Sequence, residues 1–128
     1  MTITRRDMMA TTLAASAIAV APALAKEPKP MFGLNGQMIA VSGKRDELVR
    51  YLLEASTAMP GCLSYIVALD TTNPDAIWVT EVWDSGESHK ASLALPQVRT
   101  AITKARPIIA GFGSQTETIP VGGTGIKR

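Results

Sequence analysis

The order of strand-like and helix-like periodicities constrains the fold of this chain more than any single motif. Four segments have the short apolar or alternating pattern that is typical of strands. The expected strands cover residues 34–41, 62–70, 76–84 and 107–119. The expected helices cover residues 44–59, 85–95 and 97–105. The order β-α-β-β-α-β predicts a ferredoxin-like α+β fold, in which an antiparallel sheet has its helices on one face.

Local signals support these boundaries. An apolar stripe of period 3.6 predicts the first helix, and its members are Leu48, Tyr51, Leu52, Ala55 and Met59. Pro60 and Gly61 end that helix. The strands over 62–70 and 76–84 are joined by a short turn and therefore predict a β-hairpin. Ser85 is expected to cap the helix that follows.

The first 25 residues have the three zones of an export signal. Arg5 and Arg6 precede an apolar stretch that is shorter than the about 20 residues of a membrane span. The adjacent arginines resemble a twin-arginine signal, which is an address read by a receptor. We expect cleavage near Ala25, a periplasmic or secreted location and no membrane contact afterwards. The alternative is an uncleaved N-terminal anchor.

The remaining chain is the size of one domain. Its composition predicts a linker over 26–32, a single domain over 33–120 and a flexible tail over 121–128. Basic and acidic side chains are nearly balanced, with 13 Lys and Arg against 11 Asp and Glu in the whole sequence. This balance gives no support to a nucleic-acid partner.

Metal and cofactor chemistry has little support in the sequence. Cys62 is the only cysteine and His89 is the only histidine, so a multi-Cys or multi-His metal site cannot form. No glycine-rich phosphate-binding fingerprint precedes an expected helix. Cys62 is interpreted as a small buried apolar residue and not as a nucleophile. We therefore expect no metal and no cofactor.

The sheet face without helices is expected to carry Val, Ile, Trp and Tyr side chains. A contiguous apolar surface of this kind usually marks an interface. Two such sheets that pack face to face would cover both surfaces and enclose a pocket. The sequence therefore predicts a homodimer that forms a dimeric α/β-barrel.

Three short motifs carry a resemblance to a known family. They are Pro60-Gly61-Cys62 before the second strand, Glu81-Val82-Trp83 at the end of the third, and Ser88-His89 in the next helix. Together they resemble the antibiotic biosynthesis monooxygenase family over about residues 33–120. That family includes small quinol monooxygenases and polyketide-tailoring oxygenases, and its members are dimers of ferredoxin-like subunits. The family's activities are diverse, so its fold is a stronger expectation than its chemistry.

The resemblance assigns candidate substrate contacts. Trp83 matches a cavity tryptophan of the polyketide-tailoring oxygenases, His89 replaces their tyrosine, and Val79 replaces their asparagine. The loss of the asparagine argues against the same substrate. The haem-degrading branch has a tryptophan and a histidine at the positions of Ser92 and Ile102, so haem ligation of that kind is not expected.

Each candidate residue has a functional and a structural interpretation. His89 could accept a proton from a phenol or quinol, or it could face solvent. Glu81 shares a strand face with Val79 and Trp83, so it could orient His89 or accept a proton, or it could link the sheet or the dimer. Trp83 could be a flat wall for an aromatic ligand, and Tyr65 could donate a hydrogen bond to a substrate oxygen. Both could instead only pack in the core or sheet.

These observations predict an exported, cofactor-independent monooxygenase. Its partners would be O₂ and a small aromatic substrate, either quinol-like or a polycyclic phenol. His89 and Glu81 would be catalytic, and Trp83, Tyr65 and Val79 would contact the substrate. The alternative hypothesis is a non-catalytic small-molecule-binding or stress-response dimer with the same fold.

Overall fold

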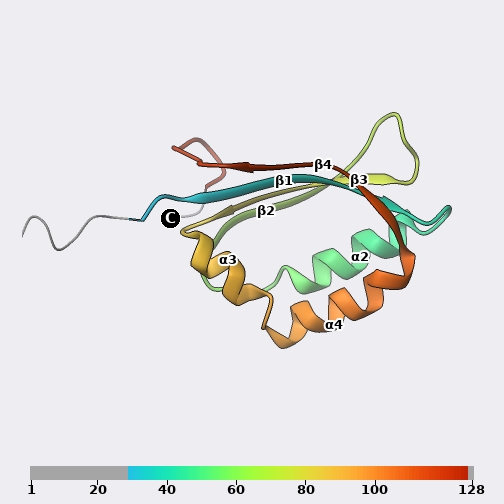
Figure 1. The fold of residues 1–128 in the computed structure, drawn as a ribbon, viewed down its shortest axis with the longest axis horizontal. Helices are drawn as coiled ribbons and strands as arrows, with labels where there is room; N and C mark the ends of the chain where they lie inside the picture. Colours follow the sequence, from blue (N-terminus) through green and yellow to red (C-terminus); the bar gives the residue numbers. More distant parts are fainter. Residues whose placement is uncertain (1–28, 127–128) are drawn as a thin grey trace, which may run out of the picture.

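A computed structural model describes residues 29–126 as one antiparallel sheet with helices on one face (Figure 1). The expected signal peptide and its cleavage near Ala25, the first three linker residues and the last two tail residues lie outside the described residues. The strands are β1 (Phe32–Ala40), β2 (Cys62–Leu69), β3 (Ala76–Trp83) and β4 (Ile109–Thr118). The helices are α2 (Arg45–Ala55), α3 (Gly86–Ser92) and α4 (Pro96–Ala105), followed by a 3₁₀ turn over Arg106–Ile108.

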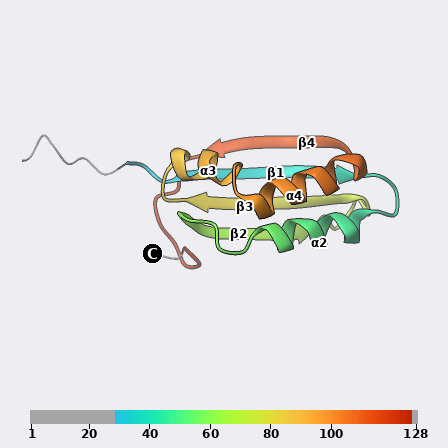
Figure 2. The same ribbon diagram turned by 90° about the horizontal axis from the view of Figure 1, so that it is seen from below.

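The strand order across the sheet is β2-β3-β1-β4, and all neighbouring strands are antiparallel (Figure 2). This topology confirms the predicted ferredoxin-like α+β fold. The sheet of one chain is open, with β2 and β4 at its edges. A barrel would therefore need a second chain. Among the described residues, no helix has the length and apolar character to span a bilayer.

Several strands and helices begin or end at other residues than predicted, because local backbone geometry determines these positions. β1 begins at Phe32, so Gly33 lies inside the strand and does not precede it. A Cβ on Gly33 would lie only 2.2 Å from the hydroxyl oxygen of Thr118, so the glycine allows β1 and β4 to approach closely. Phe32 consequently belongs to the domain and not to the linker.

The first helix is shorter than predicted. α2 ends at Ala55, where the backbone N–H of Ser56 donates to the carbonyls of Leu52 and Leu53. Ala58 then adopts a positive φ of 49°, which no helix can continue through. Met59 therefore lies beyond the helix, although the predicted stripe included it. The last strand begins at Ile109, two residues late, because the 3₁₀ turn comes first.

The core lies between the sheet and the helices. Leu48 of α2 and Ile77 of β3 are completely buried, and they pack in one cluster with Val79 and Ala105. Val79, Glu81 and Trp83 share the face of β3 that carries Ile77, as the alternation of strand side chains predicts. This face is the one that the helices cover.

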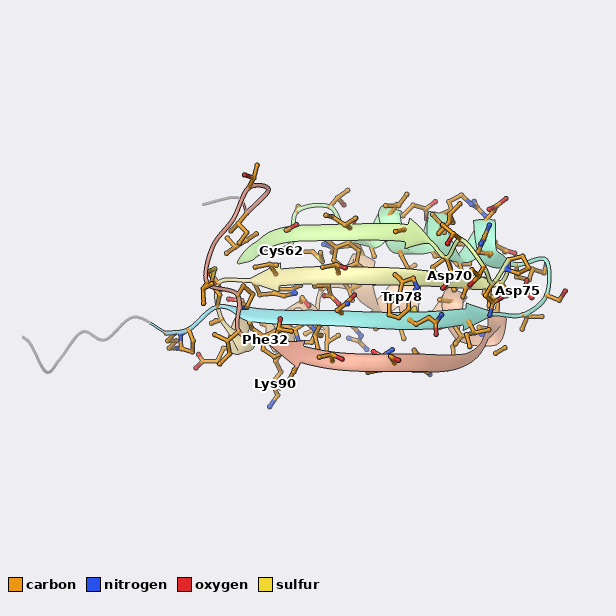
Figure 3. The ribbon with its side chains drawn as sticks, turned by 90° about the horizontal axis from the view of Figure 1, so that it is seen from above. Phe32, Cys62, Asp70, Asp75, Trp78 and Lys90 are labelled. Carbon is orange, nitrogen blue, oxygen red and sulfur yellow. The ribbon has the colours of Figure 1, made fainter. Side chains whose placement is uncertain are left out.

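Trp78 lies on the opposite face of the sheet (Figure 3). Strand alternation and the β2–β3 register place Ile66 and Val82 on the same face. Trp78 donates its indole N–H to Asp70 at 2.8 Å, and Ile66 is 57% exposed. The expectation that a tyrosine also lies on this face is wrong. Tyr65 pairs with Glu81 across β2 and β3, so its side chain lies on the helix side of the sheet.

Candidate functional site

A cavity of about 470 Å³ lies between the sheet and the helices. Most of its lining is apolar and comes from Met, Leu, Ile, Val, Ala and Phe side chains. The polar lining residues are Ser56, Tyr65, Glu81, His89 and Arg106. The sequence predicted a pocket between two sheets of a dimer. The structure of one chain does not test that pocket, and the cavity described here lies within the chain, lined by residues of all four strands and of α2, α3 and α4.

Glu81 is the acidic group of the cavity. β3 places it opposite Tyr65 of β2, and its side chain is only 17% exposed. The indole N–H of Trp83 donates to Oε1 of Glu81 at 3.0 Å. Burial raises the pKa of Glu81, while the Trp83 hydrogen bond and the nearby His89 charge act in the opposite direction. Because burial has the largest effect, the Glu81 carboxylate is more basic than a solvated one.

His89 is the basic group beside it. Its Nε2 lies 3.9 Å from Oε1 of Glu81, and its side chain is 22% exposed. The imidazole stacks on Phe32 with ring centroids 5.0 Å apart and meets Trp83 edge-on at 5.5 Å. Ser85 fixes the start of α3, because its Oγ accepts a hydrogen bond from the backbone N–H of Ser88. The cap and the two aromatic contacts hold the imidazole against the cavity.

The other predicted contacts divide into two groups. Tyr65 lines the cavity, and burial and the charge of Glu81 raise the pKa of its hydroxyl, which therefore remains a donor at neutral pH. Val79 and Trp83 are buried and are not among the lining residues. Val79 belongs to the core cluster. Trp83 contacts the cavity only through the Glu81 and His89 side chains that it supports.

Sequence reasoning missed two residues of this region. Composition assigns Phe32 to the linker, yet it forms the stacking partner of His89. The sequence motifs do not include Arg106, although it directly follows α4 and lines the cavity. Its position directly after the last turn of that helix was the available signal. Within residues 29–126, no three His, Cys, Asp or Glu side chains gather where they could hold a metal ion.

The fold and the cavity together define a class: a ferredoxin-like domain with a mostly apolar cavity between its sheet and its helices. The model of the antibiotic biosynthesis monooxygenase family matches residues 31–104, which is more than half of the chain. The chain therefore belongs to the antibiotic biosynthesis monooxygenase family, as the sequence motifs indicated.

Solved structures agree with this assignment. A protein of Chloroflexus aurantiacus J-10-fl, described as a "putative antibiotic biosynthesis monooxygenase", is 59% identical, with a TM-score of 0.74 over 75% of this chain and 98% of its own. A protein of Caulobacter crescentus CB15 with the same description is 20% identical, with a TM-score of 0.67 over 73% and 92% of the two chains. The latter supports the fold alone. Among proteins with curated descriptions, no similar sequence was found.

Proposed function

We propose that this protein is an exported monooxygenase that oxidises a quinol-like or polycyclic phenolic substrate with O₂ and needs no cofactor. The observation that carries this proposal is the His89–Glu81 pair, which lies 3.9 Å apart at the wall of an apolar cavity. A paired base and carboxylate are suited to remove a proton from a bound hydroxyl group. Family membership supports an oxygenase in preference to other proton-transfer chemistry.

The first step is deprotonation. The aromatic rings of the substrate occupy the apolar part of the cavity, whose volume falls in the range of small-molecule sites. His89 accepts the proton of the substrate hydroxyl, and Glu81 stabilises the imidazolium that forms. Tyr65 donates a hydrogen bond to the substrate oxygen as its negative charge develops. The product of this step is an electron-rich aromatic anion.

The later steps need only O₂. The anion passes one electron to O₂, and the resulting substrate radical and superoxide combine to form a carbon–oxygen bond. His89 returns its proton to the peroxide. The O–O bond then breaks as the carbon loses its hydrogen as a proton, which leaves a carbonyl group and releases one water. The substrate supplies all four electrons that reduce O₂ to the carbonyl oxygen and water, so the balance requires no external reductant.

A second candidate function is ligand binding without turnover. The cavity supports it, because an apolar site of this size can retain a small aromatic molecule by itself. The side chain at Val79 also offers no polar contact to a substrate and lies in the core. Tight retention of a co-purifying molecule, with no O₂ consumption, would support this function in place of the first.

We further propose that the protein acts as a homodimer in the periplasm or outside the cell. The sheet face opposite the helices supports the dimer, because Ile66 is 57% exposed there and lies near Trp78 and Val82. Covering this surface would remove apolar area from water, and each Å² removed contributes about 25 cal/mol to the stability of the dimer. Sedimentation of the mature protein at micromolar concentration measures its mass, and a stable monomer would contradict the dimer.

Oxygen uptake with a panel of naphthoquinols and anthrones tests the catalytic proposal. We expect the wild-type protein to consume O₂ with at least one of them, and His89→Ala to lose about 10²- to 10⁴-fold in rate. Lys90→Ala is the matched control, because Lys90 follows His89 in α3 but is exposed. Equal rates for wild type and His89→Ala would contradict the role of His89 as the base.

A further inference from the structure

The polar groups of the cavity are unevenly distributed. Tyr65, Glu81 and His89 form a cluster, since Tyr65 and Glu81 are cross-strand partners and His89 contacts Glu81. Arg106 is the only Arg or Lys among the described lining residues. Its guanidinium makes no salt bridge with any carboxylate of residues 29–126. The cavity therefore has one acid–base cluster and one separate cationic group.

The strand register separates these two groups along the sheet. Glu81 is level with Leu34 of β1, whereas Ile109, which follows the turn that contains Arg106, is level with Ala40. A strand rises about 3.3 Å per residue, so these two levels are about 20 Å apart along β1. Figure 1 shows the same separation, with α3 near one end of the sheet and the junction of α4 and β4 at the other.

Burial also differs between the two groups. Glu81 and His89 are mostly buried, whereas Arg106 is exposed. Three apolar lining residues are exposed as well: Leu93 at 49%, Ile102 at 37% and Phe112 at 60%. They lie directly after α3, in α4 and in the edge strand β4, so the cavity opens along the β4 edge. Arg106 is the charged residue of this apolar opening.

We propose that Arg106 binds a carboxylate of the substrate, so that the substrate is a phenolic or quinolic aromatic acid. This inference rests on the proposed function for the identity of the reacting group. The aromatic hydroxyl reaches His89 inside the cavity, and the carboxylate remains at the opening beside Arg106. A guanidinium matches a carboxylate with two parallel hydrogen bonds.

The exposure of Arg106 makes this arrangement favourable. A carboxylate that stays in contact with water avoids most of the cost of burying a charge. The apolar lining then stabilises the rings, while Arg106 fixes which end of the molecule enters first. Neutral aromatics of the same shape would keep the apolar contribution and lose the fixed orientation.

Binding of redox-inert probes tests the inference without turnover. The probes are ω-(6-hydroxy-2-naphthyl)alkanoic acids with one to eight methylene groups, together with their methyl esters, titrated calorimetrically at pH 7.5. At the best chain length we expect the acid to bind about tenfold more tightly than the ester, since the ion pair is partly solvated. Arg106→Gln should remove this preference and leave the affinity for the ester unchanged. Arg99→Gln, an exposed arginine of α4 outside the lining, should retain it.

The outcomes separate this inference from the proposed function. Equal affinities for acid and ester in the wild type, no binding of either, or a preference that survives Arg106→Gln would each overturn the role of Arg106. His89→Ala should retain the acid preference although it loses O₂ uptake. A protein that prefers the acid but consumes no O₂ would therefore support Arg106 and contradict the oxygenase.

Discussion

Replacement of Trp83 by Phe tests whether the core supports the candidate site. Trp83 is 1% exposed and donates its indole N–H to Oε1 of Glu81 at 3.0 Å. Phenylalanine keeps an aromatic ring at the position and removes the donor. Because this hydrogen bond lowers the pKa of Glu81 against the effect of burial, we expect the pKa of Glu81 to rise further in Trp83→Phe.

The magnitude follows from the kind of hydrogen bond. A hydrogen bond to a charged group contributes about 1.5–3 kcal/mol to stability. Trp83→Phe also removes ring atoms from the core, and that loss must be separated from the hydrogen bond. A double-mutant cycle with Glu81→Met cancels it, because both Trp83→Phe backgrounds share the smaller ring. We expect a coupling free energy of about 1.5 kcal/mol at pH 8.

Urea unfolding of the four proteins of the cycle measures the coupling, and the carboxyl ¹³C shift of Glu81 measures its pKa. Trp78→Phe is the matched control, because Trp78 donates to Asp70 on the opposite face of the sheet. Its coupling to Glu81→Met should lie below about 0.5 kcal/mol. Additive free energies for Trp83 and Glu81, or an unchanged pKa of Glu81 in Trp83→Phe, would show that the indole N–H does not stabilise the Glu81 carboxylate.

Three further substitutions test the structural elements around the site: the cap of α3, the β2–β3 hairpin and the core. Ser85→Ala removes the hydrogen bond that caps α3, so we expect a loss of about 1 kcal/mol in urea unfolding and slower turnover through a less fixed His89. Asp70→Asn should destabilise the hairpin at neutral pH. The backbone N–H groups that bind Asp70 hold its pKa well below its usual range. The stabilisation is therefore present above the ordinary carboxyl pKa and is lost as pH falls. The free energy of unfolding should consequently depend less on acidic pH in Asp70→Asn than in the wild type. Asp75→Asn is the control and should keep the wild-type dependence. Leu48→Ala creates a void in the completely buried core and should cost about 2–5 kcal/mol in thermal or urea unfolding.

The fold could be predicted from the sequence because its elements carry strong local signals. The period of α2, the cap at Ser85 and the alternation around Glu81 all agree with the structure. Two element ends were mispredicted where one backbone position decides the outcome. Gly33 lies outside the predicted strand, yet its missing side chain lets β1 and β4 approach each other, and Ala58 ends the helical path through its positive φ.

The site was less predictable, because it depends on contacts between distant elements. Strand alternation placed Glu81 on one face with Trp83, but it could not show that the indole of Trp83 points to the carboxylate. The stacking of Phe32 on His89 joins the start of β1 to α3 and has no sequence signal. Arg106 reaches the cavity only because a 3₁₀ turn redirects the chain between α4 and β4.

We propose that the His89–Glu81 cavity inserts one oxygen atom of O₂ into a phenolic substrate. Turnover under ¹⁸O₂ with a quinol that supports O₂ uptake tests it most directly, with the product mass and the peroxide yield as readouts. We predict one ¹⁸O atom in each product molecule, no accumulated hydrogen peroxide, and loss of both label and uptake in His89→Ala. An unlabelled product with stoichiometric hydrogen peroxide, or undiminished labelling in His89→Ala, would contradict the claim.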